Sequence, residues 1–149
     1  ALKPKYLQPV DTKTTVVDTK NFLVYGLTTK LTEATLSEWI EAANGYTMDA
    51  VPASGSYYGT GSTITVSPAS STTIAATYTI IIYCDLNGDG EITSTDDNIL
   101  GAHLDGDDVS VLVEGSAAFI AADLDRNGAI TENDYDLYST TVNQVNPAA

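Results

Sequence analysis

The chain has 149 residues, which suits one average domain or two small ones, and its hydrophobic fraction of 43% argues against disorder. Its formal net charge of −14 is unevenly spread: residues 1–83 hold six acids and five lysines, whereas residues 84–149 hold fourteen acids and one base, Arg126. A chain with so little basic surface cannot meet phosphates, so these numbers exclude nucleic acid as a partner.

Residues 1–83 have the pattern of a small α+β module. A linker or lead-in strand is expected at 1–10, and strands are expected at 14–17, 21–27, 46–51, 62–66 and 76–83. A helical pattern opens at Thr32 and places Leu36, Trp39, Ile40 and Ala43 on one face, until 44–45 stops it. We therefore predict a small sheet packed on one helix, with Trp39 as a core aromatic residue.

Residues 84–149 contain an internal repeat. The segment DLNGDGEITSTD at 85–96 aligns without gaps on DLDRNGAITEND at 123–134, with six of twelve positions identical. Each copy carries glycine at position 6, Gly90 or Gly128, where the backbone must turn sharply. Each also carries isoleucine at position 8, and we expect Ile92 and Ile130 to pair the two copies across a short β-bridge.

Each copy has oxygen-bearing residues at the spacing that calcium requires. Calcium takes six to eight oxygens, and a loop supplies them from side chains at positions 1, 3, 5 and 12 and from the carbonyl at position 7. The first loop offers Asp85, Asn87, Asp89, the carbonyl of Glu91, and Asp96; the second offers Asp123, Asp125, Asn127, the carbonyl of Ala129, and Asp134. We predict two calcium ions, which also hold the fold together because the converging carboxylates otherwise repel one another.

The elements around the loops complete the second predicted domain. A helix is expected after each loop, at 96–104 and 134–142, and a short helix at 116–122 leads into the second loop. The first loop follows a strand instead of a helix. We therefore predict an α+β module at 1–83 followed by an all-α domain at 84–149 with two calcium-binding loop–helix motifs. Because only Cys84 separates the strand from Asp85, the two domains should share an interface.

Residues 85–146 resemble the dockerin family. The motif that carries the resemblance is D-x-N-x-D-G-x-I-x-x-x-D followed by an apolar helix, twice, with FIAAD at 119–123 introducing the second copy. Dockerins are non-catalytic and bind cohesin domains, which places their parent enzymes or scaffoldins in cellulosomes or on the cell surface. The resemblance implies a cohesin partner, an extracellular location and a monomer before cohesin binding. It also implies cohesin contacts at Ser94, Thr95, Asn98, Ala102, Glu132, Asn133, Tyr138 and Thr140.

Residues 1–83 are similar to the X-modules that precede dockerins in extracellular proteins of anaerobic gut and rumen Firmicutes. The similar segments are VYGL at 24–27, GTGSTITV at 59–66 and YTIIIY at 78–83. Two departures from many dockerins concern the docking face. Small residues replace a Lys-Arg pair on each helix, and Ser94-Thr95 differs from Glu132-Asn133, which breaks the symmetry between the two copies.

Three other functions compete with this interpretation. An enzyme is disfavoured because His103 fits a surface or boundary position and Cys84 has no base beside it in sequence. A calcium sensor is disfavoured because the only methionine, Met48, lies outside the loops. A calcium-stabilised adhesion or carbohydrate-binding module stays open, supported by Trp39 and by 57–58. No transmembrane run or signal peptide is visible, and the abrupt start suggests a piece of a longer secreted protein.

Overall fold

The structure is a computed structural model that describes residues 6–10, 15–18, 20–27, 30–53, 55–107 and 110–145, and for 139–145 it describes the backbone alone. The predicted lead-in at 1–10 and the strand at 14–17 therefore lie partly outside the described residues. A short strand overlaps the described part of each of these two segments: β1 (Leu7–Pro9) in the first and β2 (Val16–Asp18) in the second.

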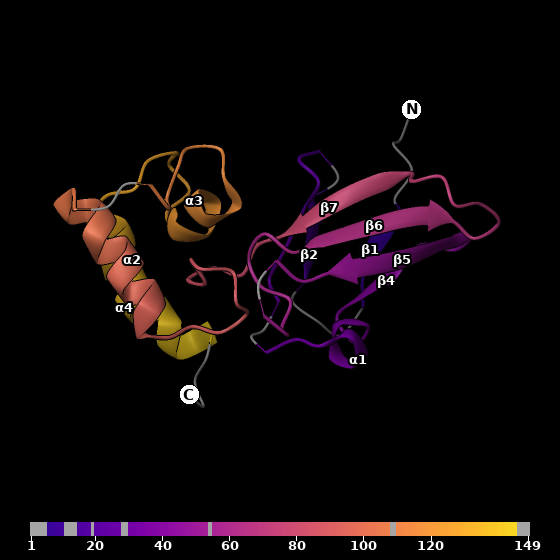
Figure 1. The fold of residues 1–149 in the computed structure, drawn as a ribbon, viewed down its shortest axis with the longest axis horizontal. Helices are drawn as coiled ribbons and strands as arrows, with labels where there is room; N and C mark the ends of the chain where they lie inside the picture. Colours follow the sequence, from indigo (N-terminus) through magenta and orange to yellow (C-terminus); the bar gives the residue numbers. More distant parts are fainter. Residues whose placement is uncertain are drawn as a thin grey trace.

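A five-stranded sheet forms the body of the N-terminal half (Figure 1). Its strand order is β2-β3-β7-β6-β5, and all neighbours are antiparallel except β3 and β7. The strands after β2 are β3 (Leu23–Tyr25), β5 (Tyr46–Val51), β6 (Thr63–Pro68) and β7 (Ala76–Ile80). The prediction at 46–51 is confirmed residue for residue, and those at 21–27, 62–66 and 76–83 are confirmed with shifted ends.

Alternation of apolar side chains gives this sheet its core. In β6, Ile64 and Val66 are fully buried, and in β7 Tyr78 and Ile80 are fully buried, while their neighbours face outward. A period of two places such residues on one face of a sheet. The predicted core aromatic residue, Trp39, packs against the buried residues of this core and is itself partly buried.

The predicted helix from Thr32 through Ala43 is wrong beyond its first turn. Helix α1 (Glu33–Leu36) is one turn long, and β4 (Ile40–Ala42) pairs with β1 in a separate two-stranded sheet. The buried Ile40 enters the core as a strand residue. Pairing with β1 supplies the backbone hydrogen bonds that a longer helix would have supplied, so tertiary context overrides the local pattern.

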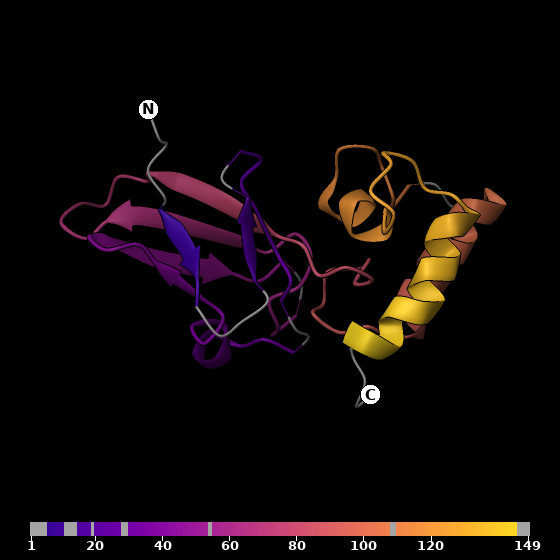
Figure 2. The ribbon, with the colours of Figure 1, turned by 180° about the vertical axis from the view of Figure 1, so that it is seen from behind.

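Three helices follow the sheet, at the predicted places. They are α2 (Ser94–Asp105), α3 (Ala117–Ala122) and α4 (Glu132–Val145). Helices α2 and α4 lie side by side in both views (Figures 1 and 2). They run antiparallel, because Tyr138 of α4 reaches Thr93 at the start of α2, and Glu132 shares a cavity with Leu104 near the end of α2.

The all-α fold class predicted for the second half is wrong. Over the described residues, the chain is a mixed α/β protein with a five-stranded sheet, a two-stranded sheet and four short helices. Leu23 and Tyr25 of β3 pack against the second cluster of buried residues, together with Tyr83, so the helices share their core with the sheet half. The predicted interface between the two halves is confirmed by this shared core. In the part of the chain described, no helix is long and apolar enough to cross a membrane.

Candidate metal centres

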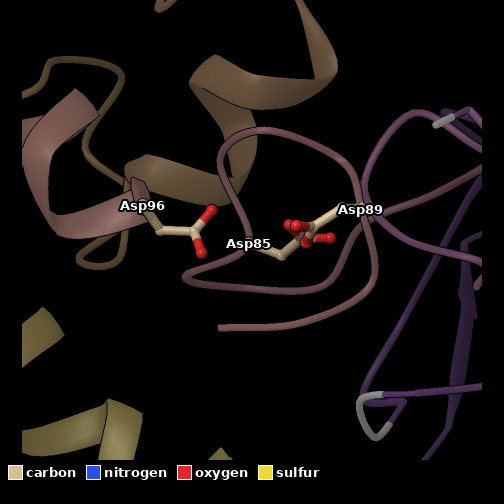
Figure 3. Close-up of side chains that lie close together, drawn as sticks. All are labelled: Asp85, Asp89 and Asp96. Atoms are coloured by element: carbon tan, nitrogen blue, oxygen red, sulfur yellow. The ribbon is translucent and has the colours of Figure 1, made fainter. Parts of the chain in front are cut away.

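The first acidic loop brings three carboxylates together. Carboxylate oxygens of Asp85, Asp89 and Asp96 all lie within 4.8 Å of one another. Figure 3 shows Asp85 and Asp89 on the loop itself and Asp96 on the first turn of α2. Both Asp85 and Asp96 are fully buried. Such a cluster can hold a metal ion.

Backbone N–H groups of the same loop point at these carboxylates. Asp85 accepts from the N–H of Gly88 at 3.1 Å and of Gly90 at 3.0 Å. Asp96 accepts from the N–H of Leu86 at 2.7 Å and of Thr93 at 2.8 Å. Gly88 and Gly90 have φ values of 79° and 82°, which only glycine adopts without strain. The glycines thus let the backbone wrap around the carboxylates.

The second loop repeats this geometry. Oxygens of Asp123, Asp125 and Asp134 lie within 4.8 Å of one another. Asp123 accepts from the N–H of Gly128 at 2.8 Å, and Asp134 accepts from the N–H groups of Asp125 at 3.2 Å and Thr131 at 2.8 Å. The sequence repeat is therefore a repeat of structure, and the second cluster can also hold a metal ion.

The remaining predicted ligands lie in the same two loops. Asn87 donates its side-chain N–H to Asp89 at 3.1 Å, and Asp89 accepts from the N–H of Glu91 at 2.9 Å. In the second loop, the side-chain oxygen of Asn127 accepts from the N–H of Ala129 at 2.9 Å. Positions 5 and 7 are thus tied together in both loops. This turn carries the chain from one side of the cluster to the other.

Burial makes negative charge on the carboxylates of the first cluster energetically costly. Desolvation, with a contribution from the charge of Asp96, raises the pKa of Asp85 to about 7. Desolvation also raises the pKa of Asp96. A cation bound among these oxygens would reverse the effect, because it favours the ionised carboxylates. The donor set is entirely oxygen, which suits hard cations.

The two loops differ in what surrounds them. The first loop is packed against the sheet half. The N–H of Thr60 donates to Asp85 at 3.0 Å, and Nζ of Lys30 lies 3.8 Å from Oε1 of Glu91. The second loop is more exposed and meets the sheet through Arg126, whose guanidinium lies 5.1 Å from the ring centroid of Tyr25. Sequence reasoning missed both contacts. The lone base in an acidic segment was a usable signal for Arg126, but nothing marked Thr60.

The predicted docking residues fall into two groups. Five are exposed in the first five residues of α2 or the first two of α4, and Ala102 is partly buried. The exposed residues are Ser94, Thr95, Asn98, Glu132 and Asn133. Tyr138 is a correction: it is 4% exposed and packs between α4 and α2, so it belongs to the core and cannot be part of an exposed face. Thr140 lies in α4, and its side chain lies outside the part described.

Other singled-out residues have structural roles. The expected β-bridge between Ile92 and Ile130 is absent among the described strand pairings, and both residues instead contact the second core. Cys84 is fully buried, and burial raises the pKa of its thiol to about 12, which keeps it protonated and unreactive. His103 is partly buried, as a boundary residue should be, and Tyr58 belongs to the sheet core.

Comparison of the chain with protein-family models, with curated proteins and with solved structures finds no match in any of the three.

Proposed function

We propose that this chain is a non-catalytic, calcium-dependent assembly module that binds a cohesin domain. The observation that carries the proposal is the matched pair of acidic loops, each followed by a helix. In both, the N–H at position 6 donates to the carboxylate at position 1, and the N–H at position 9 donates to the carboxylate at position 12. One such loop is a common surface feature. Two in register, on antiparallel helices that pack together, form a symmetric frame that is typical of a docking module.

Calcium is the ion that we propose for both centres. Each loop carries oxygen-bearing side chains at positions 1, 3, 5 and 12, and three carboxylates of each loop converge. Such a set of hard oxygen donors favours calcium over softer or smaller metals. Extracellular calcium modules work at ion concentrations of roughly 0.1–1 mM, which a secreted protein meets. We therefore also propose an extracellular location, with the parent enzyme or scaffoldin attached to this chain.

The geometry suggests how calcium would control docking. Asp96 belongs to the first carboxylate cluster and also accepts from the N–H of Thr93, which caps the start of α2. Asp134 does the same at the start of α4, with Thr131. A cation that gathers these carboxylates would fix both helix starts. The exposed pairs Ser94-Thr95 and Glu132-Asn133 sit at those starts, so they would become ordered together.

The test is binding of the full chain to a panel of immobilised cohesins, with calcium and with excess EDTA. The proposal predicts a calcium-dependent complex with at least one cohesin. Asp85→Ala combined with Asp123→Ala should abolish that complex in the presence of calcium, while Asp49→Ala, an exposed carboxylate on β5, should not. Binding that persists in EDTA would contradict the proposal.

A second candidate function rests on a cavity between the sheet and the second loop. This cavity of about 500 Å³ is lined in part by Tyr25, Tyr83 and Phe119, and by the carboxylates of Asp18 and Glu114. Aromatic rings with nearby carboxylates suit a sugar, so a calcium-stabilised carbohydrate-binding or adhesion module is the alternative. A glycan array probed with wild type and Phe119→Ala separates the two, because the proposed docking residues do not line this cavity.

A further inference from the structure

We propose that the turn formed by Gly59 and Thr60 in the sheet half is a working part of the first metal centre. The Thr60 N–H positions Asp85, and the first centre holds its ion more tightly and releases it more slowly than the second. The inference rests on the calcium part of the proposed function and goes beyond it, because it makes the two centres unequal.

Thr60 is held rigidly between the sheet and the loop. Its backbone N–H donates to Oδ2 of Asp85 at 3.0 Å, across 25 residues of sequence. Its hydroxyl donates to the carbonyl of Ile82 at 2.9 Å and accepts from the N–H of Ile82 at 3.0 Å. Thr60 is 4% exposed. A donor fixed on both sides cannot swing away, so it holds the Asp85 carboxylate in one orientation.

Gly59 lets this turn approach the first loop closely enough for the Thr60 N–H to reach Asp85. A Cβ on Gly59 would collide with Oδ2 of Asp85 and with the nitrogen of Gly90, and it would lie 2.6 Å from the carbonyl oxygen of Gly88. Two of these three atoms belong to the loop backbone and cannot move aside without deforming the loop. Gly59 is also fixed from its own side, because its N–H donates to Ser62 at 3.0 Å. Any larger residue at 59 must therefore push the sheet away from the first loop.

A third contact closes the other side of the loop. The N–H of Lys30 donates to the carbonyl of Gly90 at 2.8 Å, and a Cβ on Gly90 would meet the Cβ of Tyr57 at 2.5 Å. Lys30, Tyr57 and Thr60 all belong to the sheet half. The first loop is thus enclosed by two segments of that half, one at Lys30 and one at 57–60.

The second loop has a different environment. The hydrogen bonds that Asp123 accepts, over the residues described, come from Asn127 at 3.2 Å and Gly128 at 2.8 Å, both in its own loop. Asn127, Gly128 and Ala129 are exposed, whereas Gly88 and Gly90 of the first loop are buried. A preorganised and less hydrated ligand set loses less order on binding and attracts a cation more strongly. The first centre should therefore bind calcium at least tenfold more tightly than the second.

The experiment is calcium titration calorimetry on the full chain at pH 8. It uses an Asp123→Ala background, which disables the second centre so that only the first can bind calcium. Adding Gly59→Ala should weaken this remaining site at least tenfold. Gly101→Ala is the matched control. It makes the same change at a glycine where the added Cβ would have no atom within 4 Å outside its own helix, so it should leave the calcium affinity unchanged. An unchanged affinity in Gly59→Ala would overturn the inference.

A kinetic measurement covers the case in which Gly59→Ala does not fold. Stopped-flow chelation of the calcium-loaded wild type should release the ions in two phases, and Asp123→Ala should remove the fast one. A single phase, or loss of the slow one, would also overturn the inference. If the wild type binds no calcium, the proposed function is wrong. If it binds two calcium ions with equal affinity, only the inference that the two centres are unequal is wrong.

Discussion

The carboxylate of Asp85 is fully buried and has two further carboxylates within 4.8 Å, so its charge is costly when no cation is present. Its pKa is raised from 3.8 to about 7, mainly by burial. Between these values the folded chain holds a proton that the unfolded chain releases. The free energy of unfolding of the metal-free chain should therefore fall as the pH rises from about 4 to about 7.

Urea denaturation of the metal-free chain at several pH values within this window checks that expectation. Asp85→Asn is the control, because it keeps the shape of the side chain and removes the titrating group, and its stability should fall less over the same range. A wild-type stability that rises or stays flat from pH 4 to pH 7 would contradict the assignment of a raised pKa to Asp85.

Helix α2 offers two glycines whose substitutions should have opposite effects. Gly106 ends the helix with a φ of 77°, a left-handed conformation that an alanine adopts only with strain. Gly101 lies inside the helix, and a Cβ added there would have no atom within 4 Å, so alanine at this position favours the helix. Gly106→Ala should destabilise the calcium-loaded chain by about 1 kcal/mol, and Gly101→Ala should stabilise it by up to about 1 kcal/mol. Thermal melts of both variants check the signs, and a Gly106→Ala variant that is as stable as wild type or more stable would refute the assignment of Gly106 as the helix end.

The exposed starts of α2 and α4 differ, so the proposed cohesin partner should bind in one dominant orientation. Turning the antiparallel pair by half a turn exchanges Ser94-Thr95 for Glu132-Asn133. Burying Glu132 without a cationic partner costs several kcal/mol, which should suppress the turned mode. In cohesin titrations, either Ser94→Asp with Thr95→Asp or Glu132→Ala with Asn133→Ala should abolish binding, while the other pair leaves it nearly intact. If each pair alone is tolerated and only the quadruple variant fails, both orientations occur.

Local patterns predicted some elements well and others poorly. Strand β5 and the two acidic loops follow from residues close together in sequence, so alternation and ligand spacing were enough to place them. The helix predicted from Thr32 to Ala43 failed because its second half pairs with β1, more than thirty residues away. Tyr138 was placed on a docking face by its position in the family resemblance, and that position does not show that this side chain packs toward α2.

The sheet and the helices form one connected structure across the molecule. The second core draws on Leu23 and Tyr25 from β3, and Thr60 reaches across to Asp85. That the two halves share an interface was predicted, because a single residue separates the last strand from Asp85. The contacts of that interface could not be predicted, because backbone donors such as the Thr60 N–H leave no mark on residue type. These contacts also explain why an all-α second half was the wrong expectation.

If the two acidic loops are calcium sites, the C-terminal half should depend on the ions that they hold. Calorimetric titration of calcium into the chelated full chain, with circular dichroism recorded before and after, measures both properties in one sample. We expect two ions per chain and a gain of helical signal, as the starts of α2 and α4 become fixed while the sheet signal stays constant. Binding of no calcium, with the helical signal already complete in excess EDTA, would contradict the calcium sites and the dependence together.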